Sequence, residues 1–136
     1  KGVAALSTEL RNLLGKEMQA LQLGMQAIIP AAVSGDYDSI ESIATKMKNS
    51  YILKQSLNKH QIHALHEKLP ATFIEKDNHF HYLAGMLAHV AKERKTELVN
   101  FYYSQMLESC GDCHAQFATH KFPGLSEINK SVSHDH

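Results

Sequence analysis

The 136-residue sequence predicts an all-α fold, in which four helices of one domain spanning residues 1–136 form an antiparallel bundle. Apolar residues recur at intervals of three and four over long stretches, and no stretch alternates with period two. Seven glycines and three prolines provide few turns for a many-stranded fold. With 43% hydrophobic and 21% charged residues, the chain can bury a core of ordinary size.

The first helix is expected at about residues 4–33. Ser7 or Thr8 can cap its start, Pro30 weakens its last turn, and Ser34-Gly35-Asp36 is typical of a helix end followed by a turn. Its apolar stripe, which defines one helix face, comprises Leu6, Leu10, Leu13, Leu14, Met18, Leu21, Met25, Ile28, Ile29 and Ala32.

The second helix is expected over residues 38–69. Asp38 and Glu41 have the spacing of a capping box, and Pro70 ends the helix. Because about 31 residues are long for a globular helix, a break near Asn49-Ser50 or at Asn58 is the alternative.

Residues 70–78 are expected to form a loop before a third helix at 78–93. The charged run at 92–95 then indicates a solvated corner. The fourth helix is expected at 96–120, where Phe122-Pro123-Gly124 stops it, and residues 124–136 form a loose polar tail.

The charge composition argues against two function classes. Lys+Arg and Asp+Glu number 14 each, and a neutral chain without a basic run lacks the electrostatic footprint of a nucleic-acid-binding protein. An apolar run of 18 residues is also absent, so we expect no membrane span.

The two cysteines of the chain fall within one five-residue window, Cys110-Gly111-Asp112-Cys113-His114. C-x-x-C-H is the attachment signature of c-type haem, in which two thiols add to the haem vinyl groups. On a helix, Cys110, Cys113 and His114 share one face, so the imidazole can reach the iron. Gly111 and Asp112 turn away from that face.

Other chemistries of this window are a redox pair and a zinc site. A thioredoxin-like pair needs a βαβ context near a helix N-terminus, whereas this pair lies far down a helix. A structural zinc site needs four ligands, and His120 is the nearest additional candidate.

With this motif near its C-terminus, the sequence resembles the cytochrome c-prime-like family of four-helix-bundle c-type cytochromes. The resemblance covers most of the chain. It rests on Leu10-Arg11, Glu17-Met18, Gly24-Met25, Gly35-Asp36-Tyr37, Leu69-Pro70, Phe80-His81, Cys110–His114 and Phe117. It implies one covalent haem c near the last helix, thioethers at Cys110 and Cys113, and His114 as the proximal iron ligand.

The resemblance also implies that the distal iron position faces the first helix. Counting back seven residues from Met25 reaches Met18, which lies on the apolar stripe and is the distal ligand we expect. Core filling is the ordinary role of such a methionine. Met25, a histidine such as His81, or an open sixth position are the alternatives, and a hydrogen bond near a helix start is the simpler role for His81.

The remaining polar candidates are expected to be solvated. His60, His63 and His66 recur every three residues, a spacing that drifts around a helix of 3.6 residues per turn. Arg11 and Lys16 could meet haem propionates, but surface exposure is their simpler role. His134 and His136 lie in the tail and receive no role.

The expected function is one-electron transport by a monohaem c-type cytochrome with His/Met-ligated iron, not catalysis. The alternative is a five-coordinate protein that binds NO or CO under Leu14, Leu21 and Met25; a haem-free helical interaction module requires a fortuitous motif. The resemblance implies transient redox partner proteins, a homodimer through the first two helices and a periplasmic location. The missing signal peptide says nothing against export.

Overall fold

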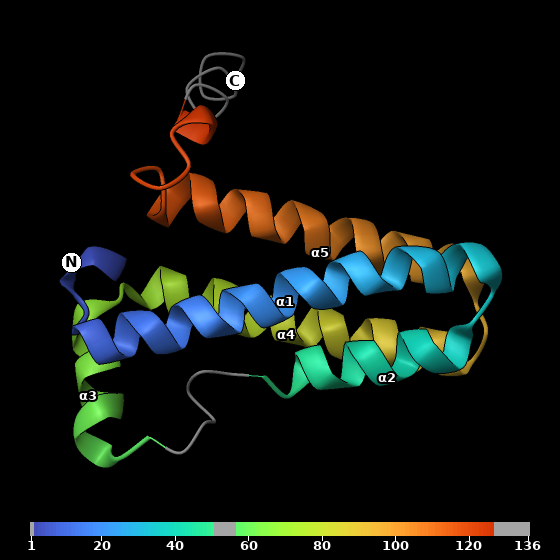
Figure 1. Ribbon diagram of the computed structural model, residues 1–136, viewed down its shortest axis with the longest axis horizontal. Coiled ribbons are helices and arrows are strands. Elements are labelled where there is room, and N and C mark those ends of the chain that lie inside the picture. The colour runs from blue at the N-terminus through green and yellow to red at the C-terminus, as the bar shows by residue number, and fades with distance from the viewer. Residues whose placement is uncertain (1, 51–56, 127–136) are drawn as a thin grey trace.

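A computed structural model describes residues 2–50 and 57–126, and the described part of the chain is helical without a strand (Figure 1). The expected all-α class is therefore confirmed. The elements are a 3-10 turn η1 (Val3–Ala5) and the α-helices α1 (Thr8–Ser34), α2 (Tyr37–Lys48), α3 (Lys59–Lys68), α4 (Ala71–Lys92) and α5 (Thr96–Phe117).

The bounds of α1 follow the sequence signals closely. The Ser7 hydroxyl oxygen accepts a hydrogen bond from the backbone N–H of Leu10, so Ser7 is the N-cap. Gly35 ends the helix in the left-handed conformation at φ 74°, which glycine adopts without steric cost. Pro30 lies inside the helix near its end and does not terminate it.

The expected continuous helix over 38–69 is wrong, and the alternative of a break near Asn49-Ser50 or at Asn58 is correct, because the structure has two shorter helices. α2 ends at Lys48, and α3 starts after Asn58. Asn58 and Gln61 form a capping box, each side chain accepting a hydrogen bond from the backbone N–H of the other residue. The expected helical residues 51–56 lie outside the described residues.

The expected loop over residues 70–78 is also wrong, because α4 begins at Ala71. Pro70 has extended backbone angles (φ −61°, ψ 151°) and occupies the N-cap position, so it starts a helix as readily as it ends one. Phe73 and Asp77 are buried in this first part of α4. α5 begins where expected, at Thr96, and ends at Phe117, three residues before the expected end at His120.

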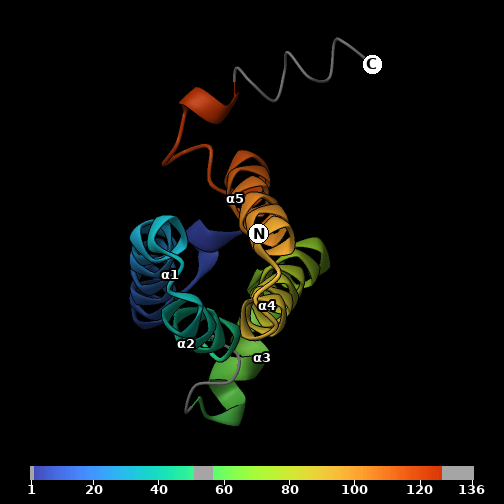
Figure 2. The same ribbon diagram turned by 90° about the vertical axis from the view of Figure 1, so that its right-hand side faces the viewer.

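The long helices alternate in direction along the molecule (Figure 1). Viewed end-on, α2 lies between α1 and α4, and α4 lies between α2 and α5 (Figure 2). α3 crosses one end of the molecule (Figure 1). The second half of α5 and the first half of α1 lie toward that same end, so the motif and Met18 share one region of the fold.

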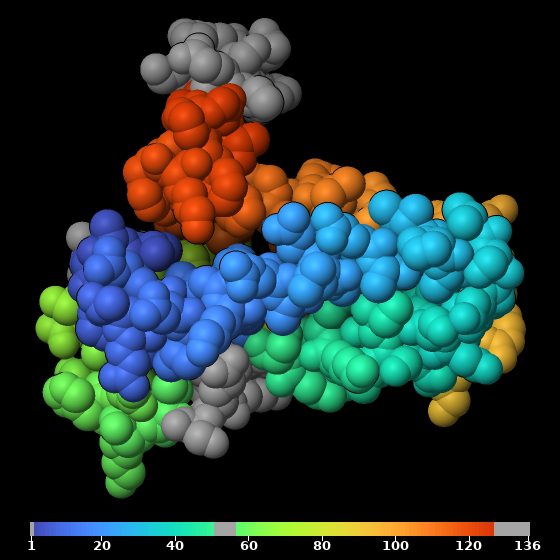
Figure 3. All heavy atoms as spheres, viewed as in Figure 1, coloured from blue at the N-terminus to red at the C-terminus, as the bar shows by residue number. Residues whose placement is uncertain are grey.

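The core divides into two clusters of buried apolar side chains. The large cluster joins α1, α2, α4 and α5 and comprises Leu21, Met25, Ile28, Ala31, Ile40, Ala44, Met47, Phe80, Leu83, Ala84, Leu87, Ala88, Val90, Ala91, Val99 and Met106. The small cluster lies toward the α3 end and comprises Leu6, Leu10, Leu14, Leu65, Leu69 and Phe73. Near that end the surface is hollowed between α1 and α5 (Figure 3).

Candidate functional site

The five-residue motif occupies the last two turns of α5. Cys110 packs against the large cluster and Cys113 against the small cluster, so both thiols point toward the interior. Both side chains are half-buried, and the two thiols are not joined by a disulfide. Asp112 is exposed instead and pairs with Lys76 of α4. Because Cys110 and Cys113 are three residues apart on α5, both face the boundary between the two clusters.

Burial favours the protonated form of both thiols. It raises the pKa of Cys110, and it raises the pKa of Cys113 to about 11, with the negative charge of Asp77 as a further cause. The influence of Asp77 indicates that the first part of α4 lies near Cys113.

His114 is half-buried at the end of α5. Its imidazole stacks on the ring of Phe122, with 4.4 Å between ring centroids and 14° between ring planes. Burial lowers the pKa of His114, and the positive charge of Lys121 lowers it further. The imidazole is therefore mainly neutral near pH 7, which is the form that binds a metal.

Met18 is half-buried on α1 and packs against both clusters. Cys110 and Cys113 border the same two clusters from α5, so the expected distal and covalent attachment residues line one region of the interior. The fully buried residue at this level of α1, however, is the neighbouring Glu17. The apolar stripe of α1 thus runs through a carboxylate between Leu14 and Leu21.

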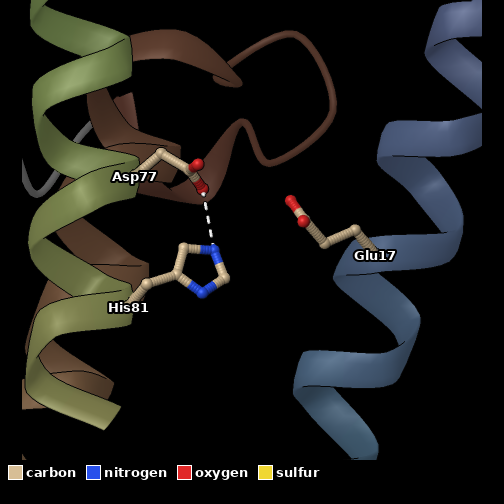
Figure 4. Close-up of side chains that lie close together, drawn as sticks. All are labelled: Glu17, Asp77 and His81. Carbon is tan, nitrogen blue, oxygen red and sulfur yellow. Dashed lines mark ion pairs between the residues drawn. The ribbon is translucent and has the colours of Figure 1, made fainter. Parts of the chain in front are cut away.

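Glu17 belongs to a buried polar group that sequence analysis did not bring together. Its carboxylate points from α1 toward Asp77 and His81 on α4 (Figure 4). These three side chains are 2%, 8% and 0% exposed. A glutamate on the apolar stripe was the sequence signal for this group; its partner Asp77 lay in the segment expected to be a loop.

His81 has contacts of its own on both ring nitrogens. Its Nδ1 donates a hydrogen bond to the backbone carbonyl oxygen of Met47 at 2.7 Å, and its Nε2 lies 3.4 Å from Oδ1 of Asp77. His81 was expected to be hydrogen-bonded near the start of a helix. The hydrogen bond is present, but the residue lies in the middle of α4 and not at its start.

The residues expected to be solvated are solvated where the structure describes them. Arg11, Lys16, His60, His63 and His66 are exposed, as is the charged corner at 92–95. His134 and His136 lie outside the described residues. No helix in the described ranges combines the length and hydropathy needed to cross a bilayer.

Comparisons with known proteins give no relative for this chain: no family model matches it, and neither does a curated protein or a solved structure.

Proposed function

We propose that this protein is a c-type cytochrome that carries one covalent haem in an antiparallel four-helix bundle and transfers single electrons. The observation that carries the proposal is a C-x-x-C-H motif whose two unpaired thiols face the interior of an all-helical protein. The hollow between α1 and α5 lies toward the end of the molecule that holds this motif (Figure 3).

The side chains of this region suit a bound haem. Cys110 and Cys113 would form the two thioethers, His114 the proximal ligand and Met18 the distal ligand, while haem itself supplies a ferrous/ferric couple. The apolar clusters around both cysteines would exclude water from the ring. Ligation by a thioether and burial both raise a reduction potential, which suits an electron carrier.

The proposal extends to the surroundings of such a carrier. Redox partner proteins would bind transiently, and a homodimer would form through α1 and α2. Covalent haem attachment in bacteria takes place outside the cytoplasm, so the protein would work in the periplasm. No catalytic activity is proposed.

The second candidate is a five-coordinate cytochrome that binds NO or CO. It is favoured by the position of Met18, which is half-buried while Glu17 occupies the centre of the buried stripe. If Met18 does not reach the iron, the sixth position is open to a diatomic ligand.

A test of haem attachment uses protein expressed with the haem-attachment machinery. Denaturing mass spectrometry should give the mass of the chain plus one haem, and acid-acetone extraction should leave the colour on the protein. A double variant, Cys110→Ala with Cys113→Ala, is the matched control and should lack covalent haem. A wild-type chain of apoprotein mass would refute the proposal.

The two candidates separate at Met18. If Met18 binds the iron, the spectrum is low-spin, and Met18→Ala should convert it to high-spin and accelerate CO binding. Met25→Ala is the control, because Met25 lies two helical turns away on the same helix. A high-spin wild type would favour the gas-binding candidate; an unchanged spectrum in Met18→Ala would contradict ligation by Met18.

A further inference from the structure

Glu17, Asp77 and His81 place three metal-ligating groups together inside the protein. Each offers a ligand atom, and these atoms lie within 4.8 Å of one another. All three side chains are more than nine-tenths buried. The close-up shows the Glu17 carboxylate aimed across the space between α1 and α4 at the pair on α4 (Figure 4). The arrangement differs from a surface cluster of acids, whose charges water screens.

The backbone fixes the orientation of the His81 ring. Because a carbonyl oxygen only accepts, Nδ1 carries a proton and donates a hydrogen bond to the Met47 carbonyl oxygen at 2.7 Å. In the neutral ring, Nε2 then carries a lone pair, and it lies 3.4 Å from Oδ1 of Asp77. Metal-binding histidines are commonly held in this way, with one ring N–H on a backbone carbonyl and the other nitrogen on the metal.

The donor set of this group suits a divalent transition-metal ion. Imidazole nitrogen and carboxylate oxygens are both ligands of Zn²⁺ in proteins, and the three ligand atoms already lie close together. A bound cation would also offset part of the cost of burying two carboxyl groups.

The spacing favours a metal ion of the zinc class. Ligand atoms around a tetrahedral Zn²⁺ with bonds of about 2.0–2.2 Å lie about 3.3–3.6 Å apart, and Nε2 of His81 and Oδ1 of Asp77 lie 3.4 Å apart. Asp77 and His81 are four residues apart on α4, so the helix itself sets their spacing. The three ligand atoms lie within 4.8 Å of one another, so the Glu17 carboxylate would move closer to the pair on α4 when it binds the same ion.

We propose that Glu17, Asp77 and His81 form a binding site for one divalent transition-metal ion such as Zn²⁺, with one nitrogen and two carboxylate ligands. The three ligands come from α1 and α4, whereas the haem-attachment motif lies on α5. Zinc affinity and the neighbours of bound zinc are measured separately from the haem mass, so failure of this proposal is distinguishable from failure of haem attachment.

The test is calorimetric titration of the purified, chelator-treated protein with ZnCl₂. A background variant with His63→Gln and His66→Gln removes two exposed histidines of α3 that could bind zinc weakly. We expect one Zn²⁺ per chain in this background. Glu17→Gln keeps the shape of the side chain and should weaken binding by at least about tenfold. Glu9→Gln, on the same helix but exposed, should leave the affinity unchanged.

X-ray absorption at the zinc edge of the wild-type protein gives a readout that needs no variant. We expect nitrogen and oxygen neighbours only. Sulfur neighbours would mean that Cys110 and Cys113 hold the zinc, and would overturn the proposal. Unchanged affinity in Glu17→Gln, or no stoichiometric binding by the wild type, would also overturn it. If Glu17→Gln does not fold, as judged by circular dichroism, the absorption spectrum decides.

Discussion

Burial of Cys113 predicts that its thiol reacts unusually slowly with alkylating reagents in the haem-free chain. The thiolate is the form that reacts with alkylating reagents. At pH 8, well below the ordinary pKa of 9.0 and the pKa of about 11 in the folded protein, the thiolate of Cys113 is about 100-fold rarer than that of an unperturbed cysteine. Alkylation should be slower by at least this factor. Unfolding in guanidinium should remove the difference.

The assay follows Cys113 alone in a Cys110→Ser variant made without haem attachment. Alkylation by iodoacetamide is measured by mass spectrometry between pH 7 and 10, with circular dichroism at each pH. In the folded protein the rate should rise about tenfold per pH unit through pH 10. In the unfolded chain it should level off near pH 9. Restricted access lowers the whole curve without moving its bend, so a folded-state curve that bends near pH 9 would refute the burial argument.

The same shift determines how stability depends on alkaline pH. Above pH 9 the unfolded chain releases the Cys113 proton, while the folded chain retains it until its pKa of about 11. The unfolded state then binds fewer protons, so the free energy of unfolding decreases as the pH rises from 9 toward 11. Urea unfolding at pH 8 and pH 10 should show a larger decrease for the wild type than for Cys113→Ser. Equal decreases would contradict the shift.

Other predictions concern the scaffold. Leu87→Ala should lower the free energy of unfolding, measured in urea, by about 3–5 kcal/mol, because Leu87 is 0% exposed. The control Leu107→Ala removes a side chain that is 59% exposed and should change this free energy by less than about 0.5 kcal/mol. Similar values for both variants would contradict the assigned core. Asn58→Ala should cost about 1 kcal/mol through loss of the α3 cap, and no loss would mean that the capping box contributes nothing. Hydrogen bonds from Ser39 lower the pKa of Asp36, so their stabilisation is present above the ordinary pKa of 3.8 and is lost as the pH falls through the lowered pKa. Asp36→Asn should make acid unfolding less steep, and an identical acid transition would argue against this linkage.

The sequence predicted those parts of the fold whose signals are local. Ser7 and Gly35 mark the ends of α1 because capping and a left-handed backbone depend on a few adjacent residues. The start of α5 at Thr96 follows a charged corner in the same way.

The predicted start of α4 was wrong because Pro70 can either end a helix or precede one. Pro70 follows the C-cap of α3, as its role as a helix terminator predicts, but it also occupies the N-cap position of α4, where a loop is expected. Its φ of −61° suits the entry to a helix, and burial of Phe73 holds the first turn against the small cluster. That contact joins distant segments of the chain, so the local sequence does not contain it.

The structure describes the surroundings of the predicted site residues. Cys110 and Cys113 share an inward helix face, as their spacing predicts. Haem attachment at these cysteines, and ligation of its iron by His114 and Met18, stay predictions. The group around Glu17 was missed, because its members converge only when α1 packs opposite α4. Helix periodicity can place a carboxylate on a buried stripe, but it cannot name the partners that face it.

The division of the core into two clusters also predicts which end of the molecule unfolds first. The six buried side chains of the small cluster enclose far less apolar area than the sixteen of the large one, so the end that holds Cys113 and Phe117 should open first. Amide protons of α3 and the last turn of α5 should then exchange with solvent deuterium well before those of Leu83–Val90. Such a sub-global opening would expose the thiol of Cys113 to a planar cofactor while the large cluster, against which Cys110 packs, stays folded.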